Sequence, residues 1–138
     1  MVILDCIYYS INAFLKRYLT TGNHDWQQYE DENGEMVGGN GTAQVEYSKY
    51  SDRWTFPDYF YTIDTTLENG MSQRIITIDT PLLVGVYSAE VNMDEHGKPP
   101  YPEYAAEKWE WLEQTLKDSD DFDFLFVAGH YMIIGYGY

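Results

Sequence analysis

The sequence is poor in the residues on which several classes of protein depend. It contains one cysteine, Cys6, so no disulfide can form within the chain. It has 8 Lys and Arg side chains against 23 Asp and Glu, which gives a formal net charge of −15. This balance argues against a nucleic-acid partner, because phosphate backbones are bound by Lys and Arg. No apolar run approaches the roughly 18 residues of a membrane-spanning helix.

Several catalytic and nucleotide-binding motifs are also missing. The chain has no Gly-rich phosphate loop with a Lys, no HExxH, no Ser nucleophile elbow and no Cys-His zinc spacing. A phosphate ester is an anion, and this strongly acidic protein would repel it. Binding such a substrate therefore requires a bound cation that reverses the local field.

The residues that are present suit one folded domain with a hydrophobic core. The 138 residues are 44% hydrophobic, with 14 Tyr, 6 Phe and 4 Trp. Apolar residues at helical spacing predict a helix over residues 2–18. Polar, acidic and Gly-rich composition predicts an exposed loop over residues 26–41, and residues 88–102 form another loop. Residues 42–50 are predicted to begin a short helix capped by Thr42.

Strand patterns occupy the second half of the chain. Residues 59–63 and 73–79 are predicted strands, joined as an antiparallel hairpin by a turn at residues 68–70. Residues 103–118 carry one apolar stripe and predict the clearest helix. Residues 122–128 are apolar nearly throughout and predict a buried strand. Strands that alternate with a helix indicate an α/β fold.

An aromatic cluster sits just before and within the first predicted strand. Its members are Trp54, Phe56, Tyr59 and Tyr61. We interpret these rings as part of the core rather than as a stacking platform for a ligand.

Two of the three histidines follow a glycine at a predicted turn or strand end. His24 lies in Gly22-Asn23-His24-Asp25, and His130 follows Gly129 at the end of the apolar strand. An amide oxygen from Asn23 and an imidazole nitrogen from His130 suit a borderline divalent metal. His24 would then face the substrate and bind a phosphate oxygen or protonate a leaving group. Asp25 would orient the His24 ring.

Other interpretations of these residues remain open. A lone histidine at a strand end is often a structural hydrogen-bonding group, and Asn-His in a turn is common. His96 lies in a polar loop and is predicted to be exposed to solvent. The spacing of the residues alone does not decide between these interpretations.

The order of several short strings carries a more specific signal. Gly22-Asn23-His24-Asp25 resembles the GNH[DE] block of the calcineurin-like metallophosphoesterases. The strings that follow it resemble, in order, the small tartrate-resistant purple acid phosphatases, and they lie at residues 39–48, 51–57, 60–61, 78–80, 111–112 and 126–131. The resemblance covers about residues 20–131 of what we interpret as a single partial domain, residues 1–138.

This resemblance implies a fold and a chemistry. The family fold is a β-sandwich flanked by helices, in four layers (α/β/β/α). A binuclear centre, Fe paired with Fe, Zn or Mn, hydrolyses small phosphomonoesters at acidic pH. The resemblance implies that Asn23 and His130 are metal ligands and that His24 contacts the phosphate. It also implies a secreted or lysosomal glycoprotein, with the sequon Asn40-Gly41-Thr42 as a glycan site, although residues 1–19 fit a signal peptide poorly.

The sequence departs from the family pattern in ways that affect activity. The first Asp block, the GDxxY block and the GHxH block are absent from residues 1–138, and the acidic segment 26–38 looks like an insertion. We therefore expect an incomplete metal centre and an inactive chain that corresponds to a central fragment of the family fold. The alternative is a catalytically silent homologue that acts as an acidic binding module. A partial sandwich would also leave strand edges open for self-association.

Overall fold

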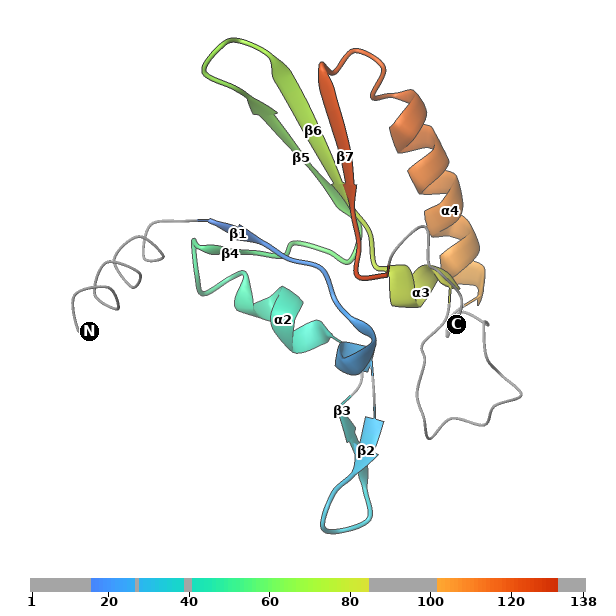
Figure 1. Cartoon of the computed structure of the whole chain (residues 1–138). Helices are drawn as coiled ribbons and strands as arrows, with labels where there is room; N and C mark the ends of the chain where they lie inside the picture. The colour runs from blue at the N-terminus through green and yellow to red at the C-terminus, as the bar shows by residue number, and fades with distance from the viewer. Residues whose placement is uncertain (1–15, 27, 39–40, 85–101, 132–138) are drawn as a thin grey trace, which may run out of the picture.

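A computed structural model describes residues 16–26, 28–38, 41–84 and 102–131 of the chain. These residues form strands and short helices in a mixed α/β arrangement, as predicted. Figure 1 shows the elements in chain order: β1 (Arg17–Tyr18), η1 (Asn23–Trp26), β2 (Gln28–Glu30), β3 (Met36–Gly38), α2 (Thr42–Tyr47), β4 (Trp54–Thr55), β5 (Tyr61–Thr66), β6 (Ser72–Thr77), α3 (Thr80–Val84), α4 (Pro102–Lys117) and β7 (Phe124–Ala128).

A three-stranded sheet in the order β5-β6-β7 forms the centre of the structure. Strands β5 and β6 are antiparallel, with Tyr61 opposite Thr77, and they are joined by a turn in which Gly70 has a φ of 85°. This hairpin was predicted, because Asn-Gly between alternating apolar residues favours a tight turn. Strand β7 pairs in parallel with β6, with Thr77 opposite Ala128.

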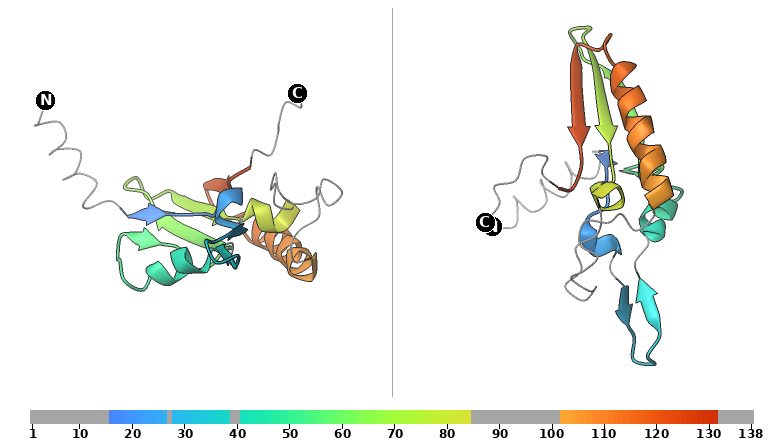
Figure 2. Two further views of the ribbon diagram at one scale, coloured as in Figure 1. Left: turned by 90° about the horizontal axis from the view of Figure 1, so that it is seen from below. Right: turned by 90° about the vertical axis from the view of Figure 1, so that its right-hand side faces the viewer.

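The two faces of this sheet pack against different elements (Figure 2). Successive side chains of a strand point to opposite faces, so Ile75 and Ile76 belong to different layers. Ile76 has no exposed surface and lies in one core cluster with Leu112 of α4 and Leu82 of α3. Ile75 packs against a second cluster that contains Phe56, Tyr61 and Ile63. The β5–β6 part of the sheet is therefore covered by α3 and α4 on one side and by the β4 region on the other.

The predicted aromatic core is confirmed. The side chains of Phe56 and Tyr61 are only 1% and 8% exposed to solvent, and Trp54 and Tyr59 pack against the same cluster. Phe56 meets Tyr59 edge-on with ring centroids 5.9 Å apart, a favoured geometry for aromatic pairs. Phe56 and Tyr61 are buried and Trp54 and Tyr59 are partly buried, so these rings belong to the core rather than to a surface for ligand stacking.

Two predictions for the first forty residues were wrong where the structure describes them. Arg17 and Tyr18 form a parallel strand with β4 instead of ending a helix. Tertiary pairing outweighs helical periodicity here, since the Arg17 N–H donates to the Arg53 carbonyl at 2.7 Å. Residues 1–15 of the predicted helix lie outside the described residues.

The predicted acidic loop contains an antiparallel hairpin, β2–β3. Asp31 closes its turn by accepting hydrogen bonds from the Asn33 and Glu35 N–H groups, and Gly34 adopts a φ of 81°. These hydrogen bonds lower the pKa of the Asp31 carboxyl. The Asn33-Gly34 pair was the overlooked signal, because Asn-Gly is typical of hairpin turns.

The helix that begins near residue 42 is confirmed, but its predicted cap is wrong. The N-cap is Gly41, in the left-handed region with φ 59°, and no side chain caps the helix. Thr42 is its first helical residue. A Cβ on Gly41 would come within 3.0 Å of the Thr21 methyl and 3.1 Å of the Tyr59 ring. Glycine therefore satisfies both the backbone conformation and the close packing at this position.

Helix α4 closely matches its predicted range, whereas the predicted burial of the last strand is wrong. All five residues of β7 are exposed, and Phe126 retains 51% of its surface. Among the described residues, no β7 side chain belongs to either core cluster and no strand pairs with the outer edge of β7, so its side chains are exposed. Residues 88–101 of the predicted loop, His96 and Asn40 lie outside the described residues, and Pro102 begins α4 instead of ending a loop. No helix in the described ranges has the length and apolar character to cross a membrane.

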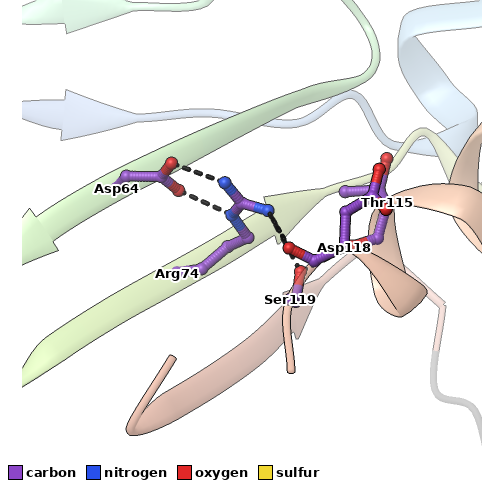
Figure 3. Close-up of polar contacts among 5 residues, drawn as sticks. All are labelled: Asp64, Arg74, Thr115, Asp118 and Ser119. Atoms are coloured by element: carbon purple, nitrogen blue, oxygen red, sulfur yellow. Dashed lines mark hydrogen bonds and ion pairs between the residues drawn. The ribbon is translucent and has the colours of Figure 1, made fainter. Parts of the chain in front are cut away.

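Arg74 joins the hairpin to the end of α4 (Figure 3). Its guanidinium donates two hydrogen bonds to Asp64, at 2.8 and 2.7 Å, and a third to the Asp118 carbonyl at 3.3 Å. It also donates to the buried Ser119 hydroxyl and lies 4.2 Å from the Phe122 ring centroid. One side chain therefore holds β5, β6 and the α4–β7 connection together at this end of the sheet.

Arg74→Ala is expected to destabilise the chain more than Asp64→Asn. The Arg74 change removes every contact of the network and should lower the free energy of unfolding by about 1–3 kcal/mol. The Asp64 change removes one half-exposed ion pair and should cost about 0.5 kcal/mol or less. Urea unfolding followed by circular dichroism measures both changes, and equal losses would contradict this assignment.

The Asp64 contribution should also depend on pH. Its pKa is lowered from the ordinary 3.8 by the hydrogen bonds from Arg74. A lowered native pKa stabilises the fold above the unfolded-state pKa, and this stabilisation is lost as the pH falls through the native value. The stability difference between the wild type and Asp64→Asn should therefore narrow in acid.

Candidate functional site

The two predicted metal ligands lie on turns that are far apart in sequence. Asn23 is the first residue of η1, shortly after β1, and His130 follows β7. The structure brings their side chains together: His130 Nε2 and Asn23 Oδ1 are 2.9 Å apart. In this hydrogen-bonded form, Nε2 carries the proton and donates to the amide oxygen. The predicted convergence of the amide and the imidazole is therefore present.

Glycine at position 22 permits this approach. A Cβ on Gly22 would lie 3.0–3.2 Å from three atoms of the His130 ring. A side chain at this position would require the ring to shift by a few tenths of an ångström, because Cβ contacts this short are rare. The glycine that precedes Asn23 thus provides the space for the imidazole.

Asp25 closes the turn that carries Asn23 and His24. One of its carboxylate oxygens accepts a hydrogen bond from the Gly22 N–H at 2.8 Å. The other accepts from the Gln44 side chain at 2.6 Å. These bonds fix the turn against α2, and the predicted role of Asp25 in orienting the His24 ring stays a prediction. The His24 side chain is exposed.

A buried carboxylate lies beneath this turn, and the sequence interpretation gave it no role. Asp79 has no exposed surface, and one of its oxygens accepts from the Thr21 hydroxyl and from Trp26 Nε1 at 3.0 Å. The other oxygen accepts from the Leu82 N–H at 2.9 Å and caps α3. Burial raises the pKa of Asp79 despite these hydrogen bonds. Asp79 before Thr80-Pro81 is a typical N-cap signal, which was available from the sequence.

Thr80, the next residue, contacts the turn that carries His130. Its Oγ1 accepts a hydrogen bond from the Tyr131 N–H at 2.9 Å. A Cβ on Gly129 would lie 2.7 Å from the Thr80 methyl carbon. Gly129 is therefore needed for the close approach of this turn to α3.

The Asn23–His130 pair has the donor chemistry of a metal site but a small donor set. Two donors that bind one divalent ion at about 2.1 Å each, side by side, lie roughly 3 Å apart. The observed separation of 2.9 Å suits this arrangement. Within the described ranges, no group of three or more His, Cys, Asp or Glu side chains could hold a metal ion. The residues thus fit part of a metal site.

The arrangement of the fold and the two side chains is typical of ligand-binding α/β proteins. The chain is a mixed α/β protein in which Asn23 and His130 meet beyond the ends of strands, where ligands bind in many α/β proteins. No protein-family model matches the chain.

The chain is similar to several acid phosphatases over most of its own length. It is 33% identical over 117 residues to tartrate-resistant acid phosphatase type 5 of Oryctolagus cuniculus. It is 32% identical over 117 residues to the Homo sapiens protein of that name and 31% identical over 122 residues to the Mus musculus protein. Each match covers 84% of this chain and 32% of the relative. The chain is therefore a homologue of the tartrate-resistant (purple) acid phosphatases, as the sequence resemblance predicted, and spans about a third of their length.

Gly22→Ala should separate His130 from Asn23. The added methyl group occupies space now taken by the imidazole, so the ring has to move. The nuclear Overhauser effects (NOEs) between Gly22 Hα and the His130 ring in the wild type give a reference. The variant should weaken the NOEs between the His130 ring and the Asn23 side chain.

Ala43→Gly is the control, because it makes a change of equal size at an exposed position of the neighbouring helix α2. It should leave the contacts of the His130 ring unchanged. If Gly22→Ala keeps the wild-type contacts between His130 and Asn23, the proposed need for glycine is wrong.

Proposed function

We propose that this chain carries part of the active site of a metal-dependent acid phosphatase of the calcineurin-like type, with small phosphomonoesters as substrates. The observation that carries the proposal is the 2.9 Å approach of Asn23 and His130 across 107 positions of sequence. The relatives are named as acid phosphatases, which supports the same activity. The formal charge of −15 adds a physical argument, because a phosphate ester needs a bound cation to approach such a chain.

Asn23 and His130 are the proposed metal-binding residues. The amide oxygen and the imidazole nitrogen suit borderline divalent ions such as Zn, Fe or Mn, and the resemblance implies a binuclear centre with iron. A tight site needs about four donors, so these two side chains provide about half of one. When bound, the metal supplies positive charge for the phosphoryl oxygens and lowers the pKa of bound water.

His24 is the proposed substrate-binding residue. It follows Asn23 directly in η1, and its side chain is exposed, so it can reach a phosphate held beside Asn23. From this position the imidazole donates a hydrogen bond to a phosphate oxygen or a proton to the leaving group. Asp25 holds the turn that presents His24 through its bonds to Gly22 and Gln44.

We further propose the location that the resemblance implies. A secreted or lysosomal enzyme would carry a glycan at Asn40, whose sequon is intact in the sequence.

Asn23→Ala and His130→Ala are each expected to abolish metal binding. Each variant removes one of two donors, and a single donor holds a divalent ion too weakly to compete with water. Line broadening by Mn²⁺ in NMR spectra of the ¹⁵N-labelled chain detects even weak binding and locates it. In the wild type, the broadening should centre on residues 22–24 and 129–131.

His24→Ala is the matched control, because it changes the same turn without removing a proposed ligand. It should keep the Mn²⁺ broadening and lose the response to added inorganic phosphate. Metal binding of wild-type strength in Asn23→Ala or His130→Ala would refute the ligand assignment. A wild-type chain that neither binds Mn²⁺ nor hydrolyses a chromogenic phosphomonoester at about pH 5 would favour the alternative, a catalytically silent acidic binding module.

We also propose that two copies of the chain associate through β7. The outer edge of this strand is open among the described elements, and its side chains are apolar and 37–51% exposed from Phe124 to Val127. Antiparallel pairing centred on Phe126 would set Asp123 of each copy opposite Gly129 of the other. This arrangement separates the acidic ends of the two strands, whereas parallel pairing would place them side by side.

Phe126→Lys should shift this association toward the monomer. A charge on an exposed edge strand opposes pairing with a second strand. Sedimentation velocity measures the shift across a series of protein concentrations. Association of the wild type should strengthen with salt, because salt screens the repulsion between two copies that each carry −15.

Thr65→Lys is the control, since it adds the same charge to β5, at the opposite edge of the same sheet. It should associate like the wild type. A wild-type chain that stays monomeric at every concentration and salt level would refute the dimer.

A further inference from the structure

Two adjacent residues hold the two candidate ligand turns in place from a single point of the fold. Asp79 and Thr80 lie where β6 leads into α3, and they are 0% and 8% exposed to solvent. We propose that Asp79 and Thr80 are positioning residues that set the distance between Asn23 and His130. This inference rests on the proposed function, in which these two side chains bind one metal ion.

Asp79 fixes the turn that carries Asn23 from both sides. Its Oδ2 accepts a hydrogen bond from the hydroxyl of Thr21, two residues before Asn23, and from the indole of Trp26, three residues after it. Both ends of the turn therefore attach to the same oxygen atom. Thr20 adds a third contact, because its hydroxyl donates to the Ile78 carbonyl at 2.9 Å.

Thr80 fixes the turn that carries His130 in the same way. Its hydroxyl oxygen accepts from the Tyr131 N–H, the residue after His130, at 2.9 Å. Its methyl group lies so close to Gly129, the residue before His130, that a Cβ there would lie 2.7 Å from it. The turn is thus restrained on each side of His130 by two atoms of one side chain.

The base that carries both residues is itself rigid. The Ile78 N–H donates to the Ala128 carbonyl at 2.9 Å, which extends the β6–β7 pairing up to Asp79. The Leu82 N–H donates to Asp79 Oδ1 and fixes the start of α3. A movement of one turn relative to the other therefore requires breaking bonds to this base. Binding sites need such support, because ligand atoms must be held within about 0.5 Å.

A purely structural role for the pair explains less of the geometry. Capping α3 requires only Asp79 Oδ1, yet Oδ2 is directed at the Asn23 turn. The first residue of a helix needs no hydroxyl, yet the Thr80 hydroxyl binds the backbone beside His130. The hydrogen bonds that α3 does not require are those to the turns that carry Asn23 and His130.

Thr80→Val and Thr80→Ser form the test pair in the full 138-residue chain. Valine keeps the shape of the side chain and removes the acceptor for the Tyr131 N–H, whereas serine keeps the acceptor. We expect Thr80→Val to weaken Mn²⁺ binding by about tenfold, the lower end of the range for groups that orient metal ligands. Thr80→Ser loses only the methyl contact with Gly129, so it should weaken Mn²⁺ binding less than Thr80→Val. The NOEs between Gly22 Hα and the His130 ring should weaken more in Thr80→Val than in Thr80→Ser.

Ser119→Ala is the control for a general loss of stability. Ser119 is buried and bonded to Arg74 and to the Thr115 carbonyl, and it precedes β7 at the end of the sheet remote from Thr80. This variant should lower the free energy of unfolding without changing the Mn²⁺ affinity or the NOEs. An equal loss of affinity in Ser119→Ala and Thr80→Val would assign Thr80 a structural role only and overturn the inference.

The NOE measurement separates this inference from the proposed function. If the wild type binds no Mn²⁺ but Thr80→Val still loses the contact between Gly22 and His130, the metal assignment fails and the positioning role stands. If the wild type binds Mn²⁺ and Thr80→Val keeps both the contact and the affinity, the positioning role is wrong and the metal assignment stands.

Discussion

The buried carboxylate of Asp79 is the constraint on which the candidate site depends. Its three hydrogen bonds connect Thr21, Trp26 and the start of α3, which are not neighbours in sequence. A buried carboxylate is costly unless hydrogen bonds compensate for lost hydration. Its raised pKa shows that burial outweighs those bonds for the ionised form. This unfavourable burial occurs where the turns that carry Asn23 and His130 come together.

Close packing in the same region accounts for the glycine that precedes each candidate ligand. Gly22 leaves room for the His130 ring, and Gly129 leaves room for Thr80. Neither glycine has a positive φ, so their role is close packing rather than an unusual backbone conformation. The hydrogen bonds and the close contacts together allow an amide and an imidazole to approach to 2.9 Å. This convergence and the homology to acid phosphatases are the two features that support a metal-binding role.

The exposed β7 strand and the high negative charge have opposite effects on association. Apolar side chains on an open strand edge favour pairing with another strand. A charge of −15 on each copy opposes it at low ionic strength. The apolar run predicted a buried strand, because such runs are typical of strands covered on both faces. The strand is present, but its side chains are exposed instead of buried.

The elements that could be predicted from the sequence are those whose signals are local. Helix α4 and the β5–β6 hairpin were predictable because an apolar stripe and an Asn-Gly turn act over a few residues. Asn23 and His130 were predicted as partners through the resemblance and the chemistry of their side chains. Only the tertiary structure decided that Arg17 and Tyr18 form a strand, since their partners lie in β4. It also decided that Asp79 and Thr80 support the site, because hydrogen bonds between residues over fifty positions apart follow from chain folding and leave no local pattern.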